Sequence, residues 1–208
     1  MPPEHPPSTA AAASLRAATD QEVVVAARAG NELAFRELVR RYERPVFSLI
    51  YRMVRDRELA EDLAQETFIK VLNALDSYRP EYRFSSWIFK IANNASIDHL
   101  RRKELDTLSL DGAPNAESAD EIEATALQVG DRLPTPLEDV VARELGGQIG
   151  AAIAQLRPEY RACIILRHID GRAYEEIAET LDLPLGTVKT YIHRARHELR
   201  ELLGHIRE

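Results

Sequence analysis

The sequence of 208 residues contains one cysteine, Cys163, so no disulfide can form within the chain. Disulfides persist in secreted proteins and are rare in the reducing cytoplasm, so the cysteine content favours a cytoplasmic protein. The residues around this cysteine, RACIILRHI, are mostly apolar and typical of a helix interior. We therefore predict a buried thiol that packs like a small hydrophobic side chain.

Long hydrophobic runs are also missing. No stretch approaches the roughly 18 apolar residues that a membrane-spanning helix requires, so we expect no direct insertion into a membrane. The first residues, MPPEHPPSTAAAASLRAA, contain no cationic segment followed by an apolar core, so we do not expect a signal peptide. Their Pro, Ala and Ser content predicts a disordered tail over residues 1–18.

The usual signatures of catalysis and of metal binding do not occur. The sequence has no Gly-rich phosphate loop, no Ser-His-Asp order and no convincing pair of catalytic carboxylates. His193 and His197 are four residues apart and could face a metal from one helix, but no Glu lies between them and no third ligand is near. We therefore predict a protein that is not an enzyme and needs no cofactor or metal.

The chain has a formal net charge of −7, whereas proteins that bind DNA on their own usually carry excess positive charge. Most of this acidity lies in residues 104–139, which contain ten acidic residues and one basic residue. The rest of the chain is slightly positive. We therefore predict a flexible acidic linker over 104–136, between a domain at 19–103 and a second domain at 137–208.

Apolar residues recur at helical spacing on both sides of this linker, and no stretch alternates convincingly with a period of two. Leu59, Leu63 and Val71 follow one face of a predicted helix. Pro45 interrupts another apolar pattern, which predicts a kinked helix or two abutting helices. The sequence TPLE at 135–138 is a typical helix start. The predicted fold class is all-α, in two small helical domains.

Residues 172–203 predict a helix-turn-helix, in which the second helix enters the major groove of DNA. The apolar pattern of its interior is formed by Ile177, Leu181, Leu183, Val188 and Tyr191. No acidic residue occurs from 183 to 197, so the second helix is basic. Asp182 stands in the turn, where Gly is common, and Asp also tolerates the left-handed conformation.

Three segments together resemble the extracytoplasmic-function (ECF) sigma factors of bacterial RNA polymerase. They are AEDLAQETFIKVLNAL and YRFSSWIFKIANNASIDHLRRK in the first half, and LRPEYRACIILRHIDGRAYEEIAETLDLPLGTVKTYIHRARHEL in the second. The resemblance implies sigma domains two and four, with the helix-turn-helix in domain four. It also implies an alternative sigma factor whose partners are the polymerase core, promoter DNA and an anti-sigma factor.

On the helix at 59–75, polar and acidic residues share the face opposite the apolar stripe, with an isoleucine among them. A solvated helix face is the simpler interpretation of this pattern. The resemblance instead implies a docking surface for the polymerase core, which an acidic surface would help to steer toward a basic partner. The residues predicted to bind the core are Asp62, Gln65, Glu66 and Ile69.

Residues 78–102 interleave aromatic side chains with cations, a pattern that suits single-stranded DNA because rings stack on bases and cations follow phosphates. A core position is the alternative for Trp87. The resemblance implies a reader of the opened minus-ten element. The predicted contacts are Arg83, Ser85, Trp87, Lys90, Asn94 and Arg101.

The resemblance also implies that the last long helix reads the minus-thirty-five duplex. Arg and Lys can donate to guanine edges, while other polar groups contact phosphates. The predicted contacts are Thr187, Lys189, Thr190, His193, Arg194 and Arg196.

Two other functions remain open from the sequence. A stand-alone helix-turn-helix regulator would bind a duplex tightly by itself, usually as a dimer. A protein-interaction scaffold would need no DNA, which leaves the basic helix unexplained. The linker allows the two domains either to pack together or to separate.

Overall fold

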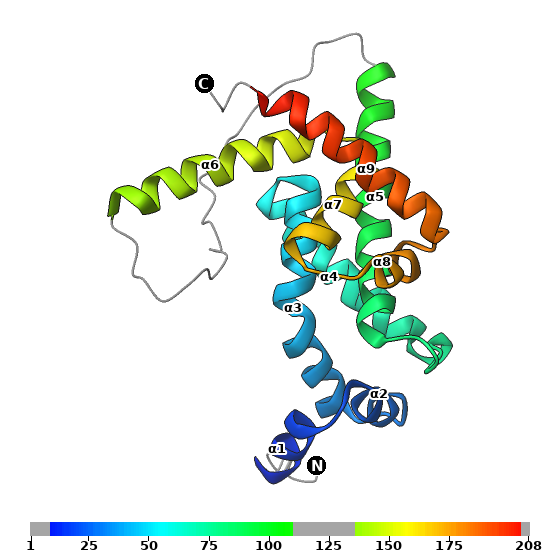
Figure 1. The fold of residues 1–208 in the computed structure, drawn as a ribbon. Helices are drawn as coiled ribbons and strands as arrows, with labels where there is room; N and C mark the ends of the chain where they lie inside the picture. The colour runs from blue at the N-terminus through cyan, green and yellow to red at the C-terminus, as the bar shows by residue number, and fades with distance from the viewer. Residues whose placement is uncertain (1–8, 110–135, 205–208) are drawn as a thin grey trace.

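The computed structural model describes the backbone of residues 9–109 and 136–204, and the side chains of 12–103 and 145–204. All regular structure within these ranges is helical, as predicted (Figure 1). The first half contains α1 (Thr9–Ala17), α2 (Asp20–Arg28), α3 (Glu32–Val54), α4 (Arg57–Ala74), the short η1 (Leu75–Ser77) and α5 (Phe84–Ser109). The second half contains α6 (Pro136–Gln155), α7 (Pro158–Ile164), η2 (Ile165–Ile169), α8 (Tyr174–Leu181) and α9 (Leu185–Leu202).

Side-chain caps define the helix starts of the first domain. Thr19 and Glu22 form a capping box at α2, the side chain of Asn31 caps α3, and that of Asp56 caps α4. The helix α3 continues through Pro45 as one element, so the expected interruption does not divide it. The helices α2, α4 and α5 all pack against α3, which makes α3 the central element of this domain.

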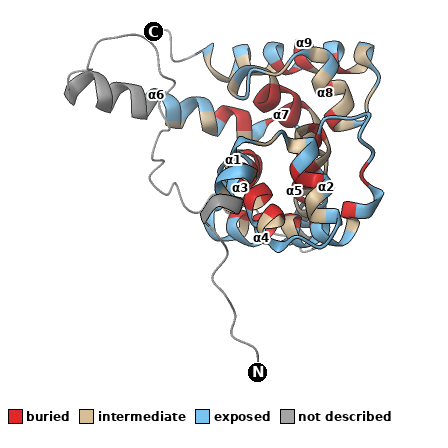
Figure 2. Cartoon of the chain, turned by 90° about the horizontal axis from the view of Figure 1, so that it is seen from below, coloured by how far each residue is buried: buried red, intermediate tan, exposed pale blue. Residues whose placement is uncertain are grey.

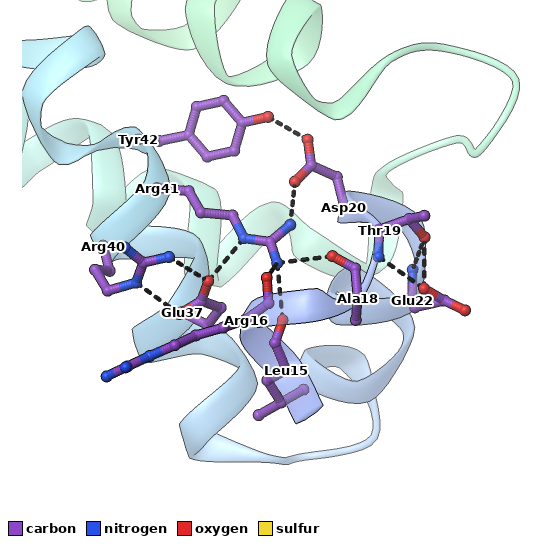
Figure 3. A network of polar contacts seen from close by, with 10 residues as sticks. All are labelled: Leu15, Arg16, Ala18, Thr19, Asp20, Glu22, Glu37, Arg40, Arg41 and Tyr42. Atoms are coloured by element: carbon purple, nitrogen blue, oxygen red, sulfur yellow. Dashed lines mark hydrogen bonds and ion pairs between the residues drawn. The ribbon is translucent and has the colours of Figure 1, made fainter. Parts of the chain in front are cut away.

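The segment expected to be a disordered tail contains α1 at residues 9–17, while residues 1–8 lie outside the described part. The prediction of disorder counted Ala together with Pro and Ser, but Ala has the highest helix propensity of all residues, and the Ala-rich part of the segment is helical. The guanidinium of Arg41, on α3, donates to the carbonyl oxygens of Leu15, Arg16 and Ala18 at the end of α1 (Figure 3). A cation at the C-terminal end of a helix is favourable, so α1 is fixed to the domain.

A buried carboxylate holds this network together. Glu37, on α3, is 6% exposed and accepts hydrogen bonds from Arg40 at 2.7 and 2.8 Å and from Arg41 at 2.8 Å (Figure 3). Arg41 also pairs with Asp20 at 2.7 Å, and the hydroxyl of Tyr42 donates to the same aspartate. The hydrogen bond from Arg40 lowers the pKa of Glu37 to about 2, although burial opposes that shift.

The predicted helix-turn-helix is present as α8 and α9. Asp182 ends α8 with φ of 55°, in the left-handed conformation that was expected to be tolerated in the turn. Val188, Ile192 and Ala195 form the buried face of α9, and Ile177 and Thr180 are the buried residues of α8. Their burial orients the opposite face of α9 toward solvent.

The two halves pack against each other through one continuous hydrophobic core. Figure 2 shows α7 between α9 and the helices of the first domain, and α7 contacts α3, α5 and α9. The buried guanidinium of Arg161, on α7, donates to the carbonyl oxygen of Met53 near the end of α3 and to those of Ala154, in the last turn of α6, and Leu156, just after α6. Burial, with the nearby charge of Arg55, lowers the pKa of Arg161 to about 10.

The expected linker falls mostly outside the described residues. Its first residues extend α5 to Ser109, beyond the predicted end near Lys103, and residues 110–135 are not described. The predicted start at Pro136 agrees with the first residue of α6. Within the described ranges, no helix has both the length and the hydropathy needed to cross a membrane.

Candidate nucleic-acid interface

The four residues predicted to bind the polymerase core, Asp62, Gln65, Glu66 and Ile69, are all exposed on α4. Their spacing places them on one face of the helix, opposite the buried Leu63, Thr67 and Val71. Glu66 forms an ion pair with Lys70 at 2.8 Å, so part of the acidic charge is balanced locally. This face therefore combines carboxylates, an amide and an exposed branched apolar side chain.

Leu72, which was not among the predicted residues, extends this face. Ile69 is 60% exposed and Leu72 is 53% exposed, three residues apart on α4. The pattern could have revealed it, because Leu72 does not fall in the register of the buried residues of this helix. Two adjacent exposed apolar side chains, bordered by acidic groups, are typical of a binding surface.

Aromatic side chains of the second predicted surface form a cluster at the start of α5. Trp87 packs against Tyr78 and Phe84, with ring centroids separated by 5.4 and 5.7 Å. Tyr78 and Phe84 are buried, whereas Trp87 is half-buried, so Trp87 both supports the cluster and keeps an accessible edge. Both interpretations of Trp87 are therefore compatible with its position.

The predicted minus-ten residues do not all share one face. Trp87, Lys90, Asn94 and Arg101 are separated by three, four and seven residues, which places them on one side of α5, whereas Ser85 lies on the opposite side. Asn93, which is adjacent to Asn94, is buried at 2% exposure. The surface therefore follows the loop before α5 and continues along one side of that helix.

The three cations of this surface are all paired with carboxylates of the second domain. Arg83 pairs with Glu176, Lys90 with Asp182 at 2.9 Å, and Arg101 with Glu159 at 2.7 Å. The hydrogen bond from Lys90 lowers the pKa of Asp182. Burial raises the pKa of Glu159, but the hydrogen bond from Arg101, a backbone hydrogen bond and the charges of Arg101 and Arg157 together outweigh it, and the net shift is downward. The lowered pKa values keep Asp182 and Glu159 ionised at neutral pH.

The third predicted surface, on α9, is open to solvent. Lys189, Thr190, His193, Arg194 and Arg196 are exposed, and Thr187 is half-buried at the edge of the helix. Thr190, His193 and Arg194 lie on the face opposite the buried residues, while Lys189 and Arg196 lie on one flank. The hydroxyl of Thr190 donates to the carbonyl oxygen of Gly186 at 2.9 Å.

Two of the arginines on α9 contact residues that precede the helix-turn-helix. A guanidinium nitrogen of Arg194 lies 3.4 Å from the hydroxyl of Tyr160, and Arg196 donates to Nε2 of His168 at 3.2 Å. Burial and the charge of Arg196 lower the pKa of His168, so the ring is neutral at physiological pH and accepts this hydrogen bond. These contacts orient the arginines while leaving their cationic groups exposed.

The described residues contain no group of three His, Cys, Asp or Glu side chains that could hold a metal ion. The three predicted surfaces are formed by side chains of α4, of α5 with the loop before it, and of α9.

Comparisons with known proteins find a family match in each half of the chain. Residues 38–105 match the family of Sigma-70 region 2, and residues 146–199 match Sigma-70, region 4. The chain is 36% identical to the ECF RNA polymerase sigma factor SigW of Bacillus subtilis (strain 168), over 84% of this chain and 91% of the relative. It is 37% identical to the ECF RNA polymerase sigma factor SigE of Mycolicibacterium smegmatis (strain ATCC 700084 / mc(2)155), over 81% of this chain and 61% of that protein.

A solved structure of CnrH in complex with the cytosolic domain of CnrY resembles the fold. The TM-score is 0.62 at 23% sequence identity, with 89% of this chain and 97% of the solved chain covered. At that identity the likeness concerns the arrangement of helices.

Proposed function

We propose that this chain, which belongs to the ECF family of RNA polymerase sigma factors, directs the bacterial polymerase core to a specific set of promoters. One observation carries the proposal. Three exposed surfaces of different chemistry occur on one chain: an acidic and apolar face on α4, an aromatic and cationic region at α5, and a basic face on α9. A protein that joins an enzyme to both single-stranded and duplex DNA needs these three surfaces.

In this proposal, the face of α4 docks on the polymerase core. Asp62 and Glu66 steer the encounter with a basic partner surface, and Ile69 with Leu72 supplies apolar area that becomes buried on docking. The exposure of both apolar residues supports this role, since their burial would be favourable by about 25 cal/mol for each square ångström removed from water.

The loop before α5 and the start of that helix capture the opened minus-ten strand. The half-buried Trp87, which packs on the buried Tyr78 and Phe84, provides a ring surface against which an unstacked base can pack. Arg83, Lys90 and Arg101 neutralise phosphates, while Ser85 and Asn94 supply hydrogen-bonding groups. The chain breaks no covalent bond in this process; it lowers the free energy of the opened DNA by binding one strand.

The basic face of α9 holds the upstream duplex. Lys189, Arg194 and Arg196 project from a helix that carries no acidic residue before Glu198, which favours entry into a groove lined by phosphates. Arg194 and His193 are placed to contact base edges. Contacts with the duplex and with the opened strand, at separate positions on the promoter, together fix where the polymerase starts.

We also propose that an anti-sigma protein restrains the factor. The exposed apolar residues of α4 support this, because a free surface made for the polymerase also offers area to a competing partner. The acidic segment over 104–136 stays a predicted linker in this scheme.

A run-off assay tests the proposal directly. Purified protein is mixed with core polymerase and a genomic promoter library, and a parallel gel shift contains the protein without polymerase. Transcripts from a defined promoter set, with little shift by the protein alone, are the expected result. A tight shift by the protein alone and no polymerase-dependent initiation would favour a stand-alone regulator instead.

A charge-reversal variant tests the docking surface. Asp62→Lys/Glu66→Lys should lose binding to core polymerase in a pull-down while its circular dichroism stays that of the wild type. The matched control is Glu32→Lys/Glu43→Lys, which reverses two exposed carboxylates on α3 and should bind core normally. If the Asp62→Lys/Glu66→Lys variant binds core polymerase as well as the control does, the face of α4 is not the docking surface.

A further inference from the structure

The second domain places its carboxylates on the cations assigned to the opened strand. Glu176, Asp182 and Glu159 pair with Arg83, Lys90 and Arg101 respectively, and every cation comes from the first domain. The backbone N–H of Arg83 also donates to Glu179 at 3.2 Å. A carboxylate that accepts from an arginine or lysine occupies the position that a phosphate oxygen would take.

The same contact also involves neutral side chains of α5. Ser86 and Asn93 lie on the same face of α5 as Lys90, and α8 packs against that helix. The guanidinium of Arg172, in the second domain, lies 4.2 Å from the centre of the Phe89 ring. A bound strand and the second domain would therefore compete for the same face.

The packing of the second domain on α5 leaves buried polar atoms of α5 without hydrogen-bond partners. Ser86 and Asn93 are each 2% exposed, yet the Oγ of Ser86 and the Oδ1 of Asn93 have no hydrogen-bond partner. A cavity of about 370 Å³ remains beside Ser86, bordered by Tyr82, Trp87 and Lys90 of the first domain and by Glu179 and Asp182 of the second. Unpaired buried polar groups are unfavourable, so this face is better suited to a different, more polar partner.

The ion pairs are also weak enough to separate. The paired side chains are between 26% and 78% exposed, and exposed pairs contribute little because water and salt screen them. The basic face of α9 points elsewhere and stays exposed while the contact is made. Closure thus affects one DNA surface and leaves the other available.

We infer that the free chain is autoinhibited: the second domain closes on α5, and its carboxylates Glu159, Glu176 and Asp182 exclude single-stranded DNA from the minus-ten surface until the domains separate. The inference rests on the proposed function, because it concerns the regulation of that same surface. Because both domains belong to one chain, their high effective concentration compensates for the weakness of the individual pairs.

The test neutralises the carboxylates without changing shape. The variant Glu159→Gln/Glu176→Gln/Asp182→Asn keeps similar volumes, and Asn tolerates the left-handed conformation of Asp182. The control Glu175→Gln/Glu198→Gln/Glu201→Gln changes the net charge equally, at residues of α8 and α9 that form no ion pair with the described residues of the first domain. Small-angle X-ray scattering gives the radius of gyration, and fluorescence anisotropy gives the affinity for a labelled single strand of about 20 nucleotides.

The interface variant should be more extended than wild type and bind the strand about tenfold more tightly, a change of about 1.4 kcal/mol. The control should retain the wild-type radius and affinity, and adding Lys90→Ala to the interface variant should remove most of the gain. An unchanged radius, or an extended variant with unchanged affinity, overturns the inference. Run-off transcription by the wild type tests the proposed function separately, and a lack of polymerase-dependent initiation would refute that function. The scattering measurement tests whether the two domains are closed on each other and does not depend on transcription.

Discussion

Replacing Glu37 by Gln should destabilise the first domain by about 2 kcal/mol at neutral pH. The carboxylate is 6% exposed and accepts from both Arg40 and Arg41, and its pKa is about 2 instead of 4.5. A difference of about 2.5 pKa units corresponds to roughly 3.4 kcal/mol at 1.36 kcal/mol for each unit. The side chain of Arg40 is 56% exposed, so solvent screening reduces this figure to the expected value.

The pH dependence has a defined sign. A carboxyl group whose folded pKa is lowered stabilises the protein above its unfolded pKa, and that contribution is lost as the pH falls from about 4.5 toward 2. The difference between wild type and Glu37→Gln should therefore be constant above pH ~5.5, and about three-fifths of it should remain at pH ~3.5. At still lower pH the two proteins should converge.

Urea unfolding followed by tryptophan fluorescence measures this difference. The chain has one tryptophan, Trp87, which packs in the aromatic cluster of the first domain and reports on that domain. Glu32→Gln is the matched control on the same helix, because Glu32 and its partner Arg36 are 86% and 72% exposed. A cost for Glu37→Gln no larger than that of the control, or a cost independent of pH, would refute the assignment of stability to this network.

Two further predictions concern other parts of the chain. Burial raises the pKa of Cys163 to about 12, so Cys163 should resist alkylation by iodoacetamide at pH 8 in the folded protein and react after denaturation, as mass spectrometry would detect; rapid native labelling would contradict its burial. Arg194→Ala should weaken transcription from promoters with an upstream element by about tenfold, through the loss of one base contact of about 1–3 kcal/mol, and unchanged promoter choice in the run-off assay would remove Arg194 from the reader.

The sequence predicted the local elements well, because their signals are local. The apolar spacing of α4 and α9 gave the faces that the structure buries, and Asp182 adopts the left-handed turn that its chemistry permits. The exposure of all four predicted residues on α4 follows from the same periodicity. These features depend on residues three or four positions apart, so a single sequence contains enough information.

The packing of one domain on the other could not be predicted in this way. Lys90 and Asp182 are 92 residues apart, and nothing local distinguishes this pair from the many other combinations of charges. Arg161 donates to the backbone carbonyl oxygen of Met53, an acceptor that every residue carries and that leaves no signature in the sequence. The attachment of α1 to the first domain could not be predicted either, because it depends on Arg41, a residue 24 positions beyond the last residue of α1.

The acidic net charge and the DNA-binding role are compatible because the charges of the second domain are segregated. Glu159, Glu176 and Asp182 face α5, whereas α9 presents Lys189, Arg194 and Arg196 on its exposed surface. Neutralising the first group would make the chain less acidic without altering the surface that contacts the upstream duplex. Overall charge is therefore a poor guide to the DNA affinity of this chain, because the position of each carboxylate relative to α5 and α9 decides which contacts can form.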